Sequence, residues 1–433
     1  MTEPADVPEP SAAQAGNDPE NRGGTLKLWQ IFLIALIAII FTVAYLSLYG
    51  LLNNAIWFQG GTLKPPRWAI PVGVLAFSLL VGLCRKYLHA PTVIHGGFTD
   101  SLKGGGEKPD YRTFPGAFLS SLFSLLSGAS IGPEGTITVL IGYISPYTRD
   151  KLKIGIGSPG TALGFDVAAL ASAFNGIIGN VLFTGIFATE FQVGGSKDAL
   201  KLLTWNLLAG TIGFLFYLLL GLPSFARSIP FAPIAQLYPA HILYAVILGI
   251  LGGLLAVFMG LSMQAIGTVM ERVFGDAVVV RVLAAGVIIA CIGYFIPEVL
   301  FSGENQLHGI IADSARIGVG MLLFMAVLKV LLLGLSFKSG YIGGPLFPIM
   351  FSSTLIGLAL NLLFPSVPVA IFVLCIEVAA ITLALGAPLT AILLVVVVGT
   401  ANQNMVVLLV ISAVTAMLLA VAMKERTAQP SVD

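Results

Sequence analysis

The sequence contains few charged residues. Only 10% of its 433 residues are Asp, Glu, Lys or Arg, whereas soluble domains carry about 25%. Between Ser339 and Met423 the only charged residue is Glu377. This scarcity excludes a soluble globular domain and a disordered chain, because neither tolerates so much apolar surface.

Cysteine, histidine and an excess of one charge are also lacking. The three cysteines and four histidines are scattered along the chain, so they form neither a disulfide framework nor a metal-ligand pattern. The 22 Lys and Arg residues nearly balance the 21 Asp and Glu residues, which gives no reason to expect a nucleic-acid partner. We therefore predict no metal, no cofactor and no nucleic acid.

Long apolar runs take up most of the chain, and 57% of the residues are hydrophobic. Runs of about 20 apolar residues are long enough to cross a bilayer as helices. They predict an all-α, multi-pass membrane protein. The polar segment 1–25 is predicted to be a disordered cytoplasmic tail, and 424–433 a second, short one. The expected spans are Leu26–Leu52, Trp68–Leu88, Leu200–Leu222, Ile242–Met270, Val278–Ile296, Gly320–Leu335, Leu346–Leu363, Val367–Leu385 and Met405–Met423.

Two apolar stretches, 114–191 and 339–399, are interrupted by Gly, Pro, Ser and Asn. They predict short or broken helices, which at membrane depth occur where backbone is buried or lines a cavity. Gly132 precedes Phe174 by 42 residues, and Gly344 precedes Gly386 by 42 residues. This match predicts two inverted repeats, 26–222 and 241–423, joined by a linker at 223–240, with the substrate site at their interface.

Lys and Arg in the connecting segments suggest the orientation. Five lie from Arg85 to Arg112, whereas two lie in 53–67. Because short cytoplasmic loops are rich in Lys and Arg, we expect the first segment, and the amino terminus with it, in the cytoplasm.

Glu134 is the first candidate functional residue. It lies in the turn Ser127–Thr136, at the predicted start of an apolar helix. Exposed N–H groups at such a helix start attract anions, and the carboxylate of Glu134 can itself occupy that place. Protonation would then vacate the place for a permeating anion, which makes Glu134 a candidate gate. The alternative is a simple helix cap.

Two further turns open apolar helices. In Lys338–Pro348, the backbone amides of Leu346 and Phe347 could face an anion, or the segment is only a tight interhelical turn. After the second, Gly386–Thr390, the helix ends near Asn402 and Asn404. Their side chains could donate hydrogen bonds to an anion, or they are interfacial turn residues.

Ionisable side chains inside apolar stretches are costly unless they are paired or reach water. Asp166, Glu190, Lys329 and Glu377 belong to this group. The three acids leave open a proton- or cation-coupled transporter of another fold. An intramembrane enzyme is not expected, because Ser127 and Ser130 lack a well-placed His within a span and Asp166 lacks a second Asp.

These motifs together resemble the CLC family of chloride channels and proton–anion antiporters. Gly132–Thr136 resembles the family segment with the external gating glutamate, and Gly343–Pro348 resembles the segment whose amides bind the central anion. Phe174-Asn175 and Ala387–Thr390 resemble two further family elements, and Lys329 resembles a family lysine. The order and spacing agree over about residues 85–422.

The resemblance implies transport of chloride or another small anion, with protons as a further substrate. It also implies voltage gating and a homodimer, and we expect a bacterial inner membrane. Glu134 would be the gate, and Glu190, near the family's internal glutamate at Ile186 or Phe187, a displaced proton relay. The anion-binding residues would be Gly132, Pro133, Gly135, Gly343, Gly344, Leu346, Phe347 and Asn402.

The chain departs from the family pattern at several positions. Pro133 replaces a basic residue, and Thr136 replaces a proline, as in the fluoride-exporting branch. The family's anion-coordinating serine should fall within Thr92–Gly97, which contains none, and its tyrosine aligns with Asn402. Fluoride and passive conduction therefore stay open as alternatives to chloride–proton exchange.

Overall fold

A computed structural model describes residues 26–59, 62–91, 109–155, 159–190, 199–222 and 231–428. The predicted tail 1–25 and the segment Thr92–Gly97 lie outside these ranges. The described chain is almost entirely helical, with one short hairpin formed by β1 (Phe58–Gln59) and β2 (Thr62–Leu63). The predicted all-α class is confirmed.

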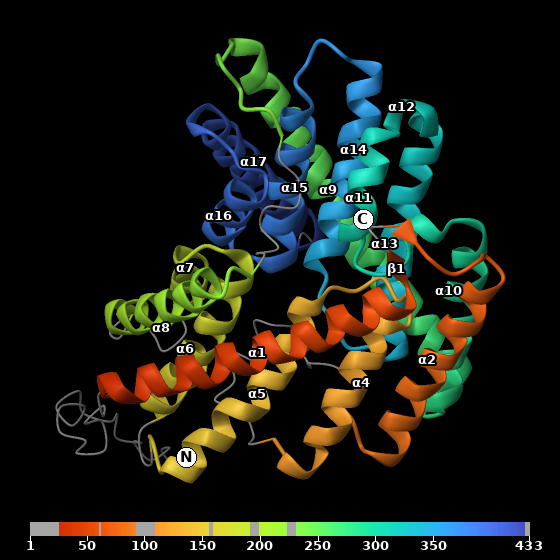
Figure 1. The fold of residues 1–433 in the computed structure, drawn as a ribbon. Helices are drawn as coiled ribbons and strands as arrows, with labels where there is room; N and C mark the ends of the chain where they lie inside the picture. The colour runs from red at the N-terminus through yellow and green to blue at the C-terminus, as the bar shows by residue number, and fades with distance from the viewer. Residues whose placement is uncertain are drawn as a thin grey trace, which may run out of the picture.

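The first half contains seven labelled α-helices (Figure 1). They are α1 (Leu28–Ile56), α2 (Ala69–Tyr87), α4 (Phe114–Leu126), α5 (Pro133–Leu152), α6 (Pro159–Ile178), α7 (Leu182–Glu190) and α8 (Ala199–Leu219). The stretch 114–191, whose Gly and Pro residues predicted broken helices, forms four of them.

The second half contains nine α-helices in its described residues. They are α9 (Pro239–Phe274), α10 (Val278–Phe295), α11 (Glu304–Ala312), α12 (Ser314–Ile317), α13 (Val319–Ser339), α14 (Leu346–Leu363), α15 (Val369–Leu385), α16 (Pro388–Val398) and α17 (Gln403–Ala428).

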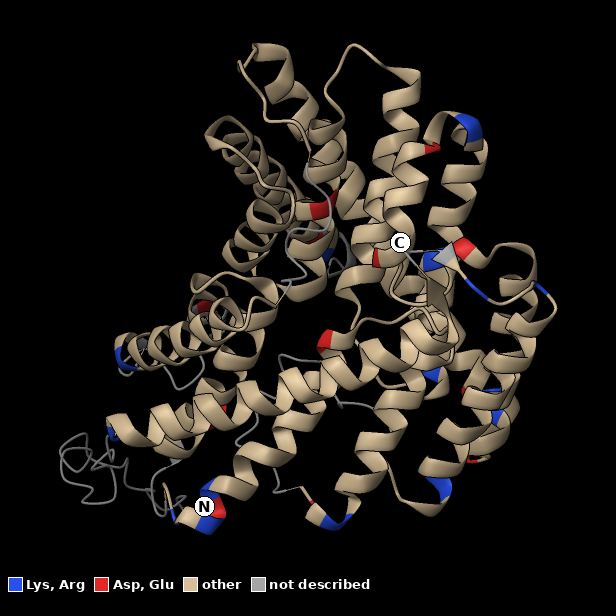
Figure 2. Cartoon of the chain, in the orientation of Figure 1, with Lys and Arg blue, Asp and Glu red and all other residues tan. Residues whose placement is uncertain are grey.

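Nine helices of the described chain are long and apolar enough to cross a membrane: α1, α2, α6, α8, α9, α10, α13, α14 and α17. The helices α15 and α16 are apolar but shorter. Figure 2 shows that most charged residues lie at helix ends and in loops, with only isolated ones inside the bundle. The chain is therefore an integral, multi-pass membrane protein.

Helix packing in the two halves follows the same scheme. In the first half α1, α6 and α8 pack against one another, and in the second half α9, α15 and α17 do the same. The helix α2 packs on α10, and α7 packs on α16, so both pairs join the two halves. This arrangement agrees with the predicted inverted repeats, while the repeat boundaries stay a prediction.

Candidate anion site

The amino-terminal ends of α5 and α14 meet inside the bundle. Just before these helices, Gly132 and Gly344 form an isolated antiparallel bridge, in which each N–H donates to the other's carbonyl at 2.8 Å. The bridge joins the two glycine-rich turns that the sequence singled out, one from each half. The sequence had suggested that the N–H groups of Gly132 and Gly344 bind an anion. Each N–H instead donates to the carbonyl of the other glycine, so neither is free for an anion.

The crossing is too tight for side chains. An added Cβ at Gly135 would lie 2.0 Å from the carbonyl oxygen of Gly343, and one at Gly343 would lie 2.5 Å from Ile131. The two turns therefore pack so closely that positions 135 and 343 have room only for glycine. Pro133, at the first position of α5, has no N–H to offer an anion.

The Glu134 carboxylate rests on the amino terminus of α14. Its Oε1 accepts a hydrogen bond from the Leu346 amide at 2.8 Å. The amides of Phe347 and of Glu134 itself also bind the carboxylate. The side chain is buried, and Oε2 has no partner in the described part of the chain. Leu346 and Phe347 therefore do present amides to an anionic group, and in this structure that group is Glu134.

The sequence placed this carboxylate at the start of its own helix, α5. In the structure it reaches a helix start of the other half as well. Gly132 and Gly344 make room for it, since added Cβ atoms would lie 2.0 Å from Oε2 and 2.2 Å from Cδ of Glu134, respectively. The glycines of both turns thus surround the carboxylate.

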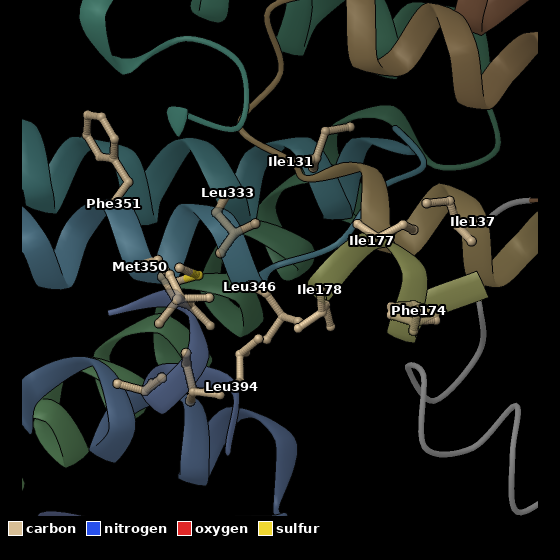
Figure 3. Packing of buried hydrophobic residues seen from close by; sticks show 14 of the residues in the cluster. Ile131, Ile137, Phe174, Ile177, Ile178, Leu333, Leu346, Met350, Phe351 and Leu394 are labelled. Carbon is tan, nitrogen blue, oxygen red and sulfur yellow. The ribbon is translucent and has the colours of Figure 1, made fainter. Parts of the chain in front are cut away.

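A cavity lies beside Glu134 and is lined almost entirely by apolar side chains. Figure 3 shows several of them, from α6, α14 and α16, pointing toward one another. Among the described residues of the lining, Glu134 is the only ionisable one. The lining consists of Pro133, Glu134, Phe174, Ile177, Ile178, Leu346, Phe347, Met350, Leu394 and Val398.

Glu190 makes a second contact of the same type. Its carboxylate accepts hydrogen bonds from the amides of Leu389 and Thr390, at 2.6 and 2.8 Å, and from Thr390 Oγ1 at 2.6 Å. These groups belong to the first turn of α16. Both Glu134 and Glu190 therefore lie in the first half and bind the start of a helix in the second.

Asn402 is not brought to this site. Its side-chain amide donates to the carbonyl of Ile234 at 2.8 Å, and Asn404 donates to the same carbonyl at 2.9 Å. Both side chains tie the start of α17 to the segment before α9. The contacts support their alternative role as interfacial turn residues.

The remaining ionisable residues of the apolar stretches have separate environments. Asp166 pairs with Arg149 and accepts a 2.7 Å hydrogen bond from Ser145. Glu377 is 1% exposed, and its Oε1 has no partner in the described chain. Lys329 is fully buried, and its ammonium donates to the carbonyls of residues 299–301.

Glu304 is an acidic residue that sequence reasoning missed. It begins α11 and lies within electrostatic range of Glu134 and Lys329. In the sequence it stands in the polar stretch 302–306 between two spans, which is typical of a solvated loop. Its position beside the candidate gate comes from the packing of α11 and is not visible in local sequence.

Residues 78–421 match the family described as voltage gated chloride channel. This match covers most of the chain and contains both turns that meet at Glu134. The chain therefore belongs to the CLC family, whose members are channels and transporters, and the resemblance drawn from the motifs is confirmed.

Curated relatives agree with this family. The chain is 25% identical over 350 residues to "Putative ion-transport protein YfeO" of Escherichia coli O7:K1, covering 77% of this chain and 78% of the relative. It is 26% identical over 321 residues to the protein of the same name from Salmonella newport, covering 72% and 73%.

Solved structures share the fold. A CLC-type fluoride/proton antiporter matches with a TM-score of 0.70 and 18% identity, over 90% of this chain and 94% of that one. A slow cyanobacterial Cl⁻/H⁺ antiporter matches with a TM-score of 0.73 and 18% identity, over 92% and 97%.

Proposed function

We propose that this protein moves small anions, with chloride as the main substrate, across a membrane, and that Glu134 is its gate. The observation that carries the proposal is the hydrogen bond from the Leu346 amide to Glu134 Oε1. A group of backbone amides at a buried helix start suits an anion, and the carboxylate now takes that place. A permeating anion would occupy it once the carboxylate leaves.

Protonation supplies the reason for the carboxylate to leave. A charged carboxylate binds amides more strongly than a neutral carboxylic acid does. Proton binding to Glu134 therefore weakens its hold on α14, and lower external pH should raise anion flux. Among the described residues that line the adjacent cavity, none has a cationic side chain to hold the anion, so the backbone amides would bear most of the coordination.

Glu190 is our candidate for a proton relay. Its support is the position of its carboxylate at the contact between α7 and α16. A glutamine there keeps one carbonyl oxygen, which can accept from one of the Leu389 and Thr390 amides, but it cannot exchange a proton. Glu190→Gln should therefore retain chloride flux and lose coupled proton movement. Unchanged proton flux in this variant would refute the role.

We also propose a homodimer in a bacterial inner membrane, with one pathway per subunit. The bacterial relatives and the family support this assembly and location. Light scattering of the purified protein in detergent tests the dimer, and a monomer mass under conditions that preserve transport would contradict it.

The deciding experiment measures ion efflux from liposomes loaded with chloride. Chloride and pH electrodes record the wild type, Glu134→Gln and the matched control Glu271→Gln, whose side chain is exposed at the end of α9. We expect chloride efflux from the wild type that rises at acidic pH. Glu134→Gln should lose this pH response and any coupled proton movement, while Glu271→Gln behaves as the wild type.

The same liposomes distinguish the alternatives. Proton movement opposed to chloride efflux indicates an antiporter, and its absence indicates a channel. Fluoride efflux without chloride efflux would replace chloride by fluoride as the substrate. If Glu134→Gln leaves transport and its pH dependence unchanged, Glu134 is not the gate.

A further inference from the structure

Arg85 is a buried cation that has no hydrogen-bond partner among the described residues. It lies in the last turn of α2, and its residue is 6% exposed. Its Nε, Nη1 and Nη2 all lack a hydrogen-bond acceptor in the part of the chain that the structure describes. A guanidinium carries five N–H donors, and burying it without acceptors is strongly unfavourable. Its environment therefore calls for an acceptor from outside the chain.

The charged group that acts on Arg85 is a second arginine. Arg281 lies in the first turn of α10 and adds a repulsive charge beside Arg85. The packing of the two helices brings these ends together, since an added Cβ at Gly82 of α2 would lie 3.2 Å from Val279 of α10. The Nε of Arg281 is also buried without a partner in the described chain. The contact between the end of α2 and the start of α10 therefore carries two positive charges.

The carboxyl end of α13 also packs against Arg85. An added Cβ at Gly340 would lie 1.3 Å from Arg85 Nη1, so the guanidinium packs directly on this glycine. The hydroxyl of the preceding Ser339 is also buried without a partner in the described residues. Unpartnered donors of α2 and α13 therefore lie where these two helix ends meet, and the charge of Arg281 on α10 acts on the same guanidinium.

Helix carbonyls do not satisfy these donors. A cation near a helix carboxyl end gains from the helix dipole, and Arg85 lies at the ends of both α2 and α13. However, the nearby carbonyls are used by backbone amides: Cys84 O accepts from Leu88 and Ala90, and Ser336 O accepts from Tyr341. The dipole explains why the charge is tolerated but leaves the N–H groups unpaired.

The position is close to the candidate gate. Gly340 is four residues before Gly344, which touches the Glu134 carboxylate. Four residues of extended chain span at most about 14 Å. Arg85 also begins the Lys- and Arg-rich segment that sequence analysis assigned to the cytoplasm. The cluster therefore lies at the proposed cytoplasmic end of the route to Glu134.

We propose that Arg85 and Arg281 form a second anion site, which holds a halide before it reaches the amides at Glu134. The nearly complete burial of Arg85 admits a small inorganic ion and excludes a bulky carboxylate or phosphate ester. Its place on the transport route rests on the proposed function, whereas halide binding by the two arginines does not. The site raises the local anion concentration on the cytoplasmic side.

Anomalous diffraction from crystals grown in bromide tests binding directly. We expect a bromide peak within hydrogen-bond distance of the Arg85 guanidinium in the wild type, and loss of that peak in Arg281→Gln. Arg281 is only half-buried, so this variant should fold even where an Arg85 variant does not. Absence of a wild-type bromide peak at Arg85 would overturn the proposal.

Transport tests the role of the site separately. In liposomes, Arg281→Gln should raise the cytoplasmic chloride concentration for half-maximal flux about tenfold, because a charge-assisted contact is lost. The control Arg272→Gln replaces an exposed arginine at the end of α9 and should leave it unchanged. A bromide peak with an unchanged half-maximal concentration would refute the transport role. A wild type that moves no halide would refute the proposed function, while the bromide peak still decides the site.

Discussion

Gly344 offers a direct test of whether the anion takes the place of the Glu134 carboxylate. An added Cβ at this glycine would lie 2.2 Å from both Cδ and Oε1 of Glu134, and all three of its nearest contacts are Glu134 side-chain atoms. A methyl group at position 344 would therefore stand where the carboxylate now lies. If the anion uses the same place, the methyl group obstructs it too.

The informative background is Glu134→Ala, which removes the carboxylate and, under the proposed function, opens the gate. The Gly344→Ala methyl group then has the room that Cδ and Oε1 occupied, so the double variant should fold. The anion, however, would lose its close approach to the Leu346 amide. A hydrogen bond to a charged group contributes about 1.5–3 kcal/mol, which corresponds to roughly a 10- to 150-fold loss of anion occupancy.

Chloride efflux from liposomes compares Glu134→Ala with Glu134→Ala/Gly344→Ala. We expect flux at low chloride to fall in the double variant, with bromide affected more than chloride and fluoride least. Gly142→Ala in the same background is the control, since an added Cβ there has no atom within 4 Å. Equal flux in the single and double variants would show that the carboxylate does not mark the anion's place.

Three further substitutions have distinct expected outcomes. Asp166→Asn should weaken its partly exposed pair with Arg149 by at most about 1 kcal/mol and leave chloride efflux unchanged; abolished efflux would support the cation-coupled alternative. Lys329→Met should leave two loop carbonyls without donors and lower stability by roughly 2–4 kcal/mol, seen as earlier thermal unfolding in detergent; unchanged unfolding would contradict this. Glu377→Gln should retain both flux and its pH response, because this residue is not among those that line the cavity beside Glu134; a lost pH response would assign it a transport role.

Much of the architecture follows from elementary features of the sequence. Apolar runs longer than about 18 residues have no stable place outside a membrane or a large core, so most predicted spans are found as helices within a few residues. The Gly- and Pro-rich interruptions in 114–191 correctly predicted several short or broken helices, and the structure forms four helices there. Glu134 stood out because it is an acid at a helix start inside an apolar stretch.

Contacts between distant parts of the chain were not predictable in the same way. The sequence predicted free amides at Gly132 and Gly344, but the two residues hydrogen-bond to each other because the turns of the two halves cross. Asn402 matched an anion-coordinating position by alignment, yet its amide is used by the carbonyl of Ile234. Glu304 and the Arg85–Arg281 pair depend on helix packing, which local sequence does not encode.

The two membrane carboxylates that bind helix starts differ in how readily they can leave. Each offsets the partial positive charge of a helix amino terminus, so each has a structural reason to be there. Both oxygens of Glu190 accept hydrogen bonds from the first turn of α16. Glu134 holds α14 through Oε1, while its Oε2 has no partner among the described residues and its side chain borders a cavity. The proposed gate needs contacts that an anion can replace, and the backbone amides of α14 that bind Glu134 are such contacts. The proposed relay needs only to exchange a proton, so it can keep the hydrogen bonds that hold Glu190 on α16.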